Sequence, residues 1–331
     1  MRIVIALGGN ALLERGQRPD AEVQEHNVAR AVAALAPLAR DHELILTHGN
    51  GPQVGVLALE SAQDASLTRP YPFDALGAET QGLIGYWLLQ ELRNALPDRQ
   101  VAALITETVV AADDPAFTHP TKLVGPVYAA DEAHRLAAER GWDIAPDGDW
   151  WRRVVPSPPP REIEQIDVIA RLVDEGVLVV CAGGGGIPVV RGPEGSLHGV
   201  EAVVDKDLTA ALLAERVGAD ALLLLTDVAA VEADHGTPRA RPLGRTTAAA
   251  LRGHDFAAGS MGPKVDAACR FVERTGRPAA VGCLDDAEAI VAGRAGTLVV
   301  PSVGDDGLAG PSPAVTARLP LAASARPTPA A

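Results

Sequence analysis

The sequence predicts an α/β protein in which a largely parallel central sheet carries helices on both faces. Short apolar runs such as residues 3–7 and 44–47 end in glycine-rich loops. Helix-period segments separate these runs, and strands that alternate with helices pair in parallel. Hydrophobic residues make up 47% of the chain but aromatic residues only 3%. The core is therefore expected to consist of Ala, Val, Leu and Ile.

The expected elements follow one another in regular order. A first strand at residues 3–7 leads through a helix over about 23–40 to a second strand at 44–47. Further apolar runs, each bracketed by helix-period segments, predict strands at 101–105, 177–181, 221–226 and 279–282. Two helices are expected at 83–92, which has an apolar face, and at 208–216.

Between about residues 113 and 160 this rhythm breaks, because prolines cluster and the alternation of strand and helix lapses. We interpret the segment as an inserted subdomain or lid, since long insertions often have a function. An irregular surface excursion is the alternative. From about residue 309 the chain is rich in Ala, Pro and Ser, which predicts a disordered tail over 309–331.

Composition excludes several classes of protein. The 331 residues carry a formal net charge of −14, without a Lys/Arg-rich block, so nucleic acid is not expected as a partner. Cys181, Cys269 and Cys283 show no CxxC spacing, which argues against a disulfide framework or a zinc site. We find no signal peptide and no apolar run of membrane-spanning length, so we expect a cytoplasmic protein without a membrane partner.

Three small-residue loops follow predicted strands. Gly8, Gly9 and Asn10 follow the first, residues 47–55 follow the second, and four glycines at 183–186 follow a third. Backbone amides in such loops approach phosphate without obstruction by a Cβ atom. Tight turns without a ligand are the alternative for each loop. The spacing fits neither the dinucleotide fingerprint nor the P-loop.

Charged residues stand where phosphate is expected to bind. Asp205, Lys206 and Asp207 precede the helix at 208–216, and a solvated capping cluster is the alternative interpretation. Thr226 and Asp227 end a strand at the edge where open α/β sheets bind ligands. The turn 259–263 places Lys264 close to the start of a helix. The alternative interpretation is that Lys264 is an ordinary surface lysine. Phosphoryl transfer requires such positive charge, whereas no HExxH or GxSxG motif supports zinc or serine hydrolysis.

Taken together, these segments resemble the carbamate kinases, a branch of the amino acid kinase family. The similarity runs from about residue 2 to 300, and the string 152–158 and the region 114–122 are specific to this branch. The matching strings are residues 6–12, 47–55, 74–82, 114–117, 120–122, 152–158, 183–188, 199–207 and 259–264.

The resemblance implies a three-layer α/β/α sandwich with a protruding lid subdomain. Residues 1–308 would form one amino acid kinase domain. Its N-terminal half would bind carbamate, its lid would span about 113–160, and its C-terminal half, about 161–308, would bind the nucleotide. The resemblance, together with the apolar face at 83–92, also leads us to expect a homodimer.

The resemblance also assigns the site residues. Three lysines would neutralise the transferring phosphoryl group and one carboxylate would orient two of them: Lys122, Lys206, Lys264 and Asp207. Carbamate and the phosphoryl group would be held by Gly8, Gly9, Asn10, Gly49, Asn50 and Gly51. The nucleotide would be bordered by Gly184, Gly185, Thr226, Asp227, Met261 and Gly262. Mg²⁺ would bind mainly to the phosphates of ATP or ADP, without firmly assigned protein ligands.

The implied activity is reversible phosphoryl transfer between ATP and carbamate, giving ADP and carbamoyl phosphate, run toward ATP synthesis in arginine catabolism. One alternative is another amino acid kinase acting on a different small acid, such as acetylglutamate. The other is a regulator that binds a metabolite but transfers nothing, which would require the lysine set to be broken.

The chain departs from the family pattern in places. Ala6 stands where many amino acid kinases have a lysine, and Lys122 resembles its substitute. Ala229 and Glu232 replace a polar and an aromatic residue at the nucleotide edge, which puts nucleotide preference in question. Asp149, Trp150 and Trp151 are bulkier than the usual small residues there, which bears on lid motion.

Overall fold

A computed structural model describes residues 1–14, 16–256 and 261–301. The expected tail over 309–331 lies outside the described residues, as do Gly259 and Ser260 of the predicted turn before Lys264.

The described part of the chain folds into strands and helices that alternate over most of its length. Its helices are α1 (Ala21–Asp41), α2 (Gly51–Gln63), α3 (Phe73–Ala95), α4 (Ala130–Arg140), α5 (Ile166–Asp174), α6 (Lys206–Arg216), α7 (Ala248–Leu251), α8 (Met261–Thr275) and α9 (Ala287–Val291). The main sheet contains, in spatial order, β15 (Arg245–Thr247), β17 (Thr297–Val300), β16 (Ala279–Cys283), β12 (Ala221–Thr226), β1 (Arg2–Leu7), β2 (Glu43–His48), β9 (Leu178–Val180) and β3 (Val101–Ala103). The smaller sheets are formed by β4 (Glu107–Val109), β5 (Lys122–Tyr128), β6 (Asp143–Asp147), β7 (Trp150–Val155), β8 (Glu162–Ile163), β10 (Ile187–Arg191), β11 (Leu197–Gly199), β13 (Glu232–Ala233) and β14 (Arg241–Pro242).

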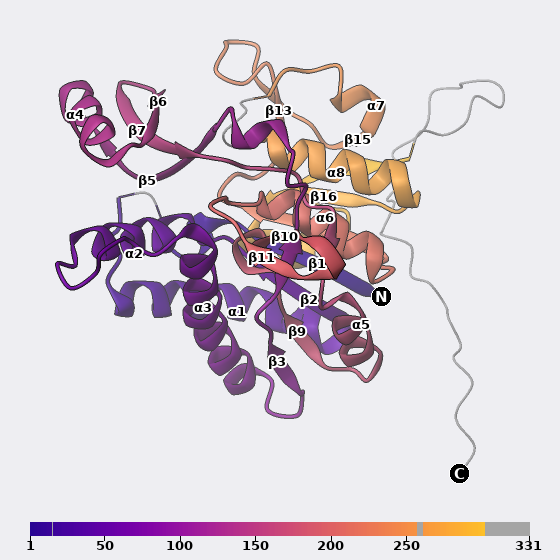
Figure 1. Cartoon of the computed structure of the whole chain (residues 1–331). Helices are drawn as coiled ribbons and strands as arrows, with labels where there is room; N and C mark the ends of the chain where they lie inside the picture. Colours follow the sequence, from indigo (N-terminus) through magenta and orange to yellow (C-terminus); the bar gives the residue numbers. More distant parts are fainter. Residues whose placement is uncertain (15, 257–260, 302–331) are drawn as a thin grey trace.

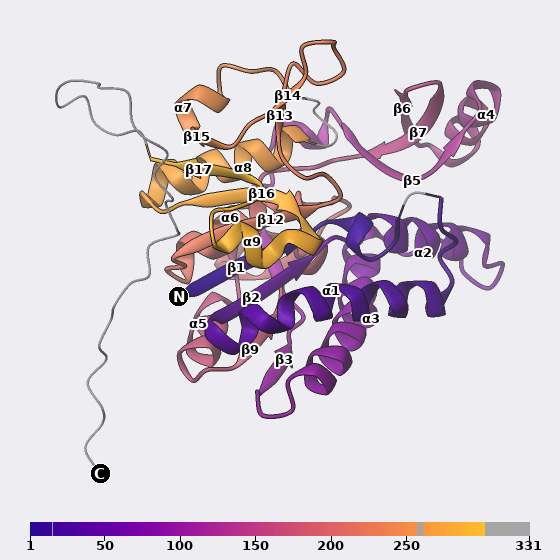
Figure 2. The ribbon, with the colours of Figure 1, turned by 180° about the vertical axis from the view of Figure 1, so that it is seen from behind.

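The main sheet confirms the predicted fold class. Its neighbouring strands pair in parallel except β16 and β17, which are antiparallel. Along β1 the buried side chains alternate, because successive residues of a strand face opposite sides. Ile3 and Ile5 join a core with α1, α3 and α9. Helices α1 and α9 lie in front of the sheet in Figure 2. Val4 and Ala6 join a second core with α5, α6 and α8.

Some boundaries differ from those expected. The strand predicted at 101–105 ends at Ala103, and Ile105 is 52% exposed. The edge strand β15 and its neighbour β17 were not predicted, since they are only three and four residues long. The four-stranded sheet β11-β10-β4-β8 was also missed. Short strands of this kind carry too little periodicity to be detected in a sequence.

Residues 122–155 form a protruding subdomain, which extends away from the main sheet (Figure 1). It contains the antiparallel sheet β5-β7-β6 and helix α4. The βαβ rhythm lapses in the sequence here because the strands pair in antiparallel fashion. Among the described helices, none combines the length and the apolar character that a membrane crossing demands.

Candidate active site

The predicted loops converge at one edge of the main sheet. Gly8 follows β1, Gly49 follows β2 and Gly183 follows the end of β9, while Thr226 is the last residue of β12. These four strands are neighbours and run in parallel, so their carboxyl ends meet at the same edge.

The first two loops touch each other through their backbones. A Cβ atom on Gly49 would lie 2.8 Å from the amide nitrogen of Gly9, so only glycine fits at position 49. The amide of Gly49 donates to the carbonyl of Leu7 and that of Gly8 to the carbonyl of Leu225, both at 2.9 Å. Two of the predicted phosphate donors are therefore used to hold the loops together.

The backbone amides of Gly9, Asn10, Asn50 and Gly51 stay candidates for binding the anion. Gly9 opens the short 3₁₀ helix η1 (Gly9–Ala11), and Gly51 opens α2. The first amides of a helix have no acceptor within it, and they attract anions. The two asparagine side chains bond within the protein. Asn10 donates to Asp227 Oδ2 at 2.7 Å, and Asn50 donates to Thr80 Oγ1 at 2.9 Å.

The Asn10–Asp227 hydrogen bond joins a residue expected on the carbamate side to one expected on the nucleotide side. Thr226 donates its hydroxyl to Asp227 Oδ1 at 3.0 Å. The two halves implied by the resemblance therefore meet where β1 and β12 end.

The four-glycine loop packs against the second loop, at His48 and Asn50. Gly184, Gly185 and Gly186 have φ values of +66°, +93° and +87°, which other residues adopt only with strain. A Cβ atom on Gly184 would lie 2.3 Å from Nδ2 of Asn50. Gly184 and Gly185 were expected beside the nucleotide. In the structure Gly184 packs next to Asn50, and a Cβ atom on Gly185 would lie 2.4 Å from the carbonyl oxygen of Val204.

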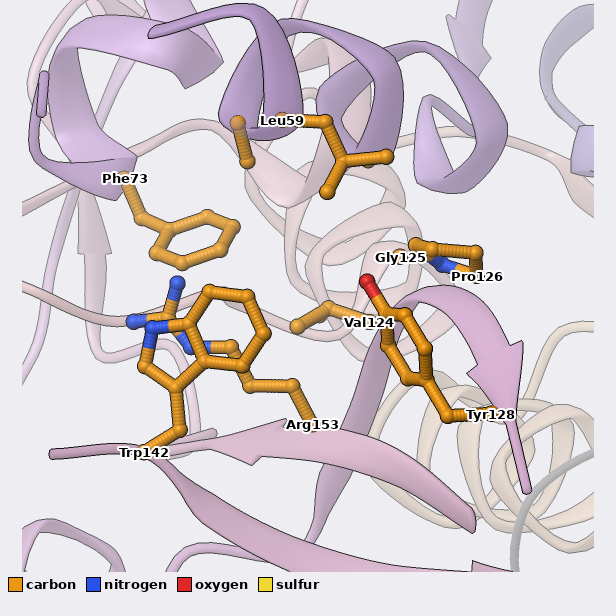
Figure 3. A pocket seen from close by; sticks show the side chains of 10 residues that line it. Leu59, Phe73, Val124, Gly125, Pro126, Tyr128, Trp142 and Arg153 are labelled. Carbon is orange, nitrogen blue, oxygen red and sulfur yellow. The ribbon is translucent and has the colours of Figure 1, made fainter. Parts of the chain in front are cut away.

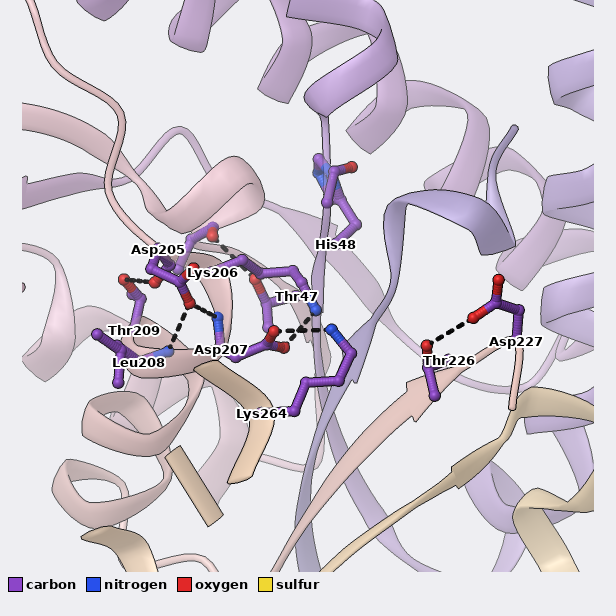
Figure 4. A network of polar contacts seen from close by, with 12 residues as sticks. Thr47, His48, Asp205, Lys206, Asp207, Leu208, Thr209, Thr226, Asp227 and Lys264 are labelled. Atoms are coloured by element: carbon purple, nitrogen blue, oxygen red, sulfur yellow. Dashed lines mark hydrogen bonds and ion pairs between the residues drawn. The ribbon is translucent and has the colours of Figure 1, made fainter. Parts of the chain in front are cut away.

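Two of the predicted lysines meet at one carboxylate (Figure 4). Lys206 Nζ donates to Asp207 Oδ1 at 2.6 Å, and Lys264 Nζ donates to Asp207 Oδ2 at 2.9 Å. Lys206 and Asp207 open α6, whereas Lys264 lies in the first turn of α8, which packs on α6. The sequence predicted this convergence through the resemblance, and the structure brings all three residues together.

Asp207 is ionised in this arrangement. Burial opposes the charge of a side chain that is only 6% exposed, but the ammonium groups of Lys206 and Lys264 outweigh it. They hold the pKa of the Asp207 carboxyl well below its ordinary value.

Lys122 joins the cluster from the protruding subdomain. It is the first residue of β5, and its Nζ lies 2.8 Å from Asp205 Oδ2. The other oxygen of Asp205 caps α6 by accepting from the amides of Asp207 and Leu208. The three lysines outnumber the two carboxylates of this cluster by one, so the cluster is positive within a chain of net charge −14. Such an excess favours an anionic ligand.

Met261 and Gly262 open α8, three and two residues before Lys264, and both are half-buried. Met261 packs against the core between α6, α8 and the sheet. Within the described ranges, no three His, Cys, Asp or Glu side chains are placed to hold a metal ion.

His48, the last residue of β2, is buried. It is 1% exposed, its Nδ1 lies 3.1 Å from the carbonyl of Gly49, and a Cβ atom on Gly183 would lie 2.3 Å from its Nε2. Burial, assisted by the charge of Lys206, lowers its pKa to about 4. His48 is therefore a neutral spacer between two of the loops.

The α/β fold with a cluster of lysines at the edge of its sheet is the arrangement of a phosphotransferase. The profile of the amino acid kinase family matches residues 1–283. The chain belongs to the amino acid kinase family.

Relatives that match most of the chain include carbamate kinases. The chain is 52% identical to the carbamate kinase of Rhizobium meliloti over 311 residues, which cover 92% of this chain and 95% of the relative. It is 48% identical to that of Escherichia coli K12, with 90% and 98% covered. The solved structure of the Giardia lamblia carbamate kinase bound to AMP-PNP is 39% identical, with a TM-score of 0.83 over 91% of this chain and 98% of that one.

Proposed function

We propose that this chain catalyses the reversible transfer of a phosphoryl group between ATP and the carboxylate oxygen of carbamate. The observation that carries the proposal is the meeting of Lys206 and Lys264 at Asp207, with Lys122 adjacent on Asp205. Relatives named carbamate kinase, matched over nine-tenths of the chain, support the choice of substrate.

Phosphoryl transfer depends on position and on charge. A carboxylate oxygen of carbamate attacks the γ-phosphorus of ATP, and the bond to the bridging oxygen breaks as ADP leaves with the electron pair. In the reverse direction a β-phosphate oxygen of ADP attacks carbamoyl phosphate, and carbamate leaves. Lys206 and Lys264 stabilise the charge on the oxygens between donor and acceptor, because Asp207 fixes both ammonium groups before the substrates arrive.

The two substrates occupy opposite sides of the sheet edge in this proposal. Carbamate lies against the amides of Gly9 and Gly51, and the nucleotide lies toward Thr226, Asp227 and the start of α8. Mg²⁺ enters with the nucleotide, because this ion keeps several waters and binds substrate phosphates with few protein ligands. It neutralises phosphate charge in support of the lysines. We further propose that the protein works in the cytoplasm and forms ATP from carbamoyl phosphate during arginine breakdown.

Acceptor specificity tests the proposal against the other amino acid kinases. Purified protein with ATP and Mg²⁺ is given either ammonium bicarbonate, which forms carbamate in solution, or N-acetylglutamate, and ADP release is measured. We expect a kcat/KM for carbamate that exceeds the value for acetylglutamate by at least about a hundredfold, since a site built for a small polar acid rejects a larger one. A preference for acetylglutamate would assign the chain to another substrate.

A further inference from the structure

The string 152–158 is one of the segments that resemble the carbamate kinases, yet none of its residues belongs to the lysine cluster. Arg153 lies in it, on β7, and β7 pairs with β5, the strand that begins with Lys122. In the register of this pair, Arg153 faces Val124, and Lys122 faces Val155. Only the pair Leu123–Val154 therefore lies between the pair that contains Arg153 and the pair that contains Lys122.

The guanidinium of Arg153 contacts both the protruding subdomain and the main body. Its Cζ lies 4.9 Å from the ring centroid of Trp142, within the subdomain, and 4.9 Å from that of Phe73, the first residue of α3 (Figure 3). A guanidinium within about 6 Å of a ring centroid is attracted by the ring. The ring of Phe73 is held in place by its surroundings, because it is 2% exposed and packs in a cluster with Val124 and Val155.

Glu201, which lies in a third segment of the chain, binds both Arg153 and the backbone of Phe73. Its Oε1 accepts from Arg153 at 3.2 Å, and its Oε2 accepts from the amide of Phe73 at 2.9 Å. Glu201 lies on the loop that leads to Asp205, and this loop is tied to the end of β7 by the bond from the Val203 amide to the Pro156 carbonyl, 2.9 Å. One carboxylate thus joins the subdomain, α3 and the loop before α6.

The neighbouring arginine has no such role. Arg152 pairs with Asp147 at 3.2 Å, and both residues lie on the β6–β7 hairpin inside the subdomain. Adjacent residues on a strand point to opposite faces. Arg152 therefore makes its contact within the subdomain, whereas Arg153 makes a contact between the subdomain and the main body.

We infer that Arg153 is a positioning residue for Lys122, holding the β5–β7 strand pair against Phe73 and Glu201 so that the Lys122 ammonium stays at the site. The expected effect on kcat rests on the proposed function, whereas the expected effect on the position of the β5–β7 strand pair does not. Lysine cannot replace Arg153, since a compact ammonium does not stack on two rings while binding a carboxylate.

The kinetic test compares Arg153→Gln with Arg152→Gln in ATP formation from ADP and carbamoyl phosphate. Arg153→Gln should lower kcat by about tenfold or more, because displacing a catalytic group by about 1 Å is that costly. The KM for ADP should change less than about twofold, as should both constants in Arg152→Gln. In a Lys122→Ala background the Arg153→Gln change should cost less than about twofold, since two residues that act through one group are not additive.

Hydrogen exchange tests the same inference without any substrate. Arg153→Gln should speed amide exchange in residues 122–128, and Arg152→Gln should not. Arg153→Lys should behave like Arg153→Gln. If Arg153→Gln does not fold, Glu201→Gln replaces it in the test, because it weakens the same contact from the main body. The Glu201 side chain is 49% exposed, and we expect its substitution to give the same changes in exchange and in kcat.

The outcomes separate this inference from the proposed function. A wild-type protein inactive on carbamoyl phosphate would refute the function, and the exchange experiment would still decide the role of Arg153. Equal exchange in the two glutamine variants, or losses that multiply fully in the Lys122→Ala background, would overturn the inference.

Discussion

At the scale of single residues, Asp207 organises the candidate site. This buried carboxylate faces the ammonium group of its neighbour Lys206 and that of Lys264, which lies 57 residues further along the chain. The hydrogen bonds to Asp207 fix the positions of both lysine side chains, which is what stabilisation of a phosphoryl transition state requires.

Lys264→Ala tests this arrangement. Asp207 keeps Lys206 as a partner, so the protein should fold, but kcat should fall by at least about a hundredfold, roughly 2.7 kcal/mol, with much less change in nucleotide binding. Lys264→Arg should rescue poorly because a planar fork does not replace a compact ammonium. Arg274→Ala is the control on the same helix, since the Arg274 side chain is 59% exposed. Near-wild-type kcat in Lys264→Ala would remove this lysine from the mechanism.

His48 gives a prediction for pH. Its pKa is about 4 in the folded protein and about 6.5 when unfolded, so above pH 7 both states are neutral and no stability is lost. Between pH 6.5 and 4 the unfolded chain takes up a proton that the folded protein refuses, and stability falls as the pH falls.

Urea unfolding of wild type and His48→Asn at pH 8 and pH 5 measures this effect. The wild type should lose about 2 kcal/mol more than the variant between the two values, because all other groups titrate equally in both. Identical losses would mean that His48 is accessible to protons in the folded state.

At the residue scale, the sequence predicted that the lysines lie together, but it did not reveal what the glycines contact. The strings around Lys122, Lys206 and Lys264 matched a known pattern, so their convergence could be expected. A glycine in a sequence does not reveal whether its amide faces a ligand or a neighbouring loop. Gly8 and Gly49 turned out to bond within the protein, and Gly184 was found to pack against Asn50.

At the scale of elements, long buried strands were predicted well and short ones were not. The run at 221–226 coincides with β12, and β1 exceeds its prediction by Arg2 alone. The antiparallel hairpin of the protruding subdomain could not be read from apolar runs, since β5 and β6 are largely exposed or half-buried. Their pairing depends on contacts that no local pattern encodes.

Helix α6 provides a test at this scale, because Asp205 both caps it and holds Lys122. Asp205→Ala removes the cap and should cost about 1 kcal/mol of unfolding free energy, whereas Asp205→Asn keeps a capping oxygen and should cost clearly less. Equilibrium unfolding by urea measures the difference. Equal losses in the two variants would show that the charge of Asp205, and not its capping, stabilises the helix start.

At the scale of the whole molecule, we still propose a homodimer, but through a different surface from the apolar helix face expected from the sequence. The apolar face over 83–92 is largely used inside the chain, where Ile84, Leu88 and Leu92 are fully buried. Leu83 and Tyr86 stay exposed, at 38% and 57%. Ile105, also exposed, follows Leu104 and precedes Thr106, whose backbone bonds to Gln81 of the same helix. This exposed patch is the surface we propose for dimerisation.

Light scattering at micromolar concentration should therefore give the mass of a dimer. Tyr86→Glu should shift the protein toward monomer, because a charge buried in an apolar interface is costly. Tyr71→Glu is the control, since Tyr71 is 51% exposed on the segment between α2 and α3. A monomeric wild type, or equal masses for the two variants and the wild type, would exclude this patch as the interface.

The central claim is that this chain moves a phosphoryl group between carbamoyl phosphate and ADP with the help of a divalent cation. The direct measurement is ATP formation by the purified protein from ADP and carbamoyl phosphate, with Mg²⁺ and again with excess EDTA. We predict ATP formation with Mg²⁺, about a hundredfold faster than with Lys264→Ala protein, and none in EDTA. ATP formation no faster than with the Lys264→Ala protein, or undiminished in EDTA, would contradict the account.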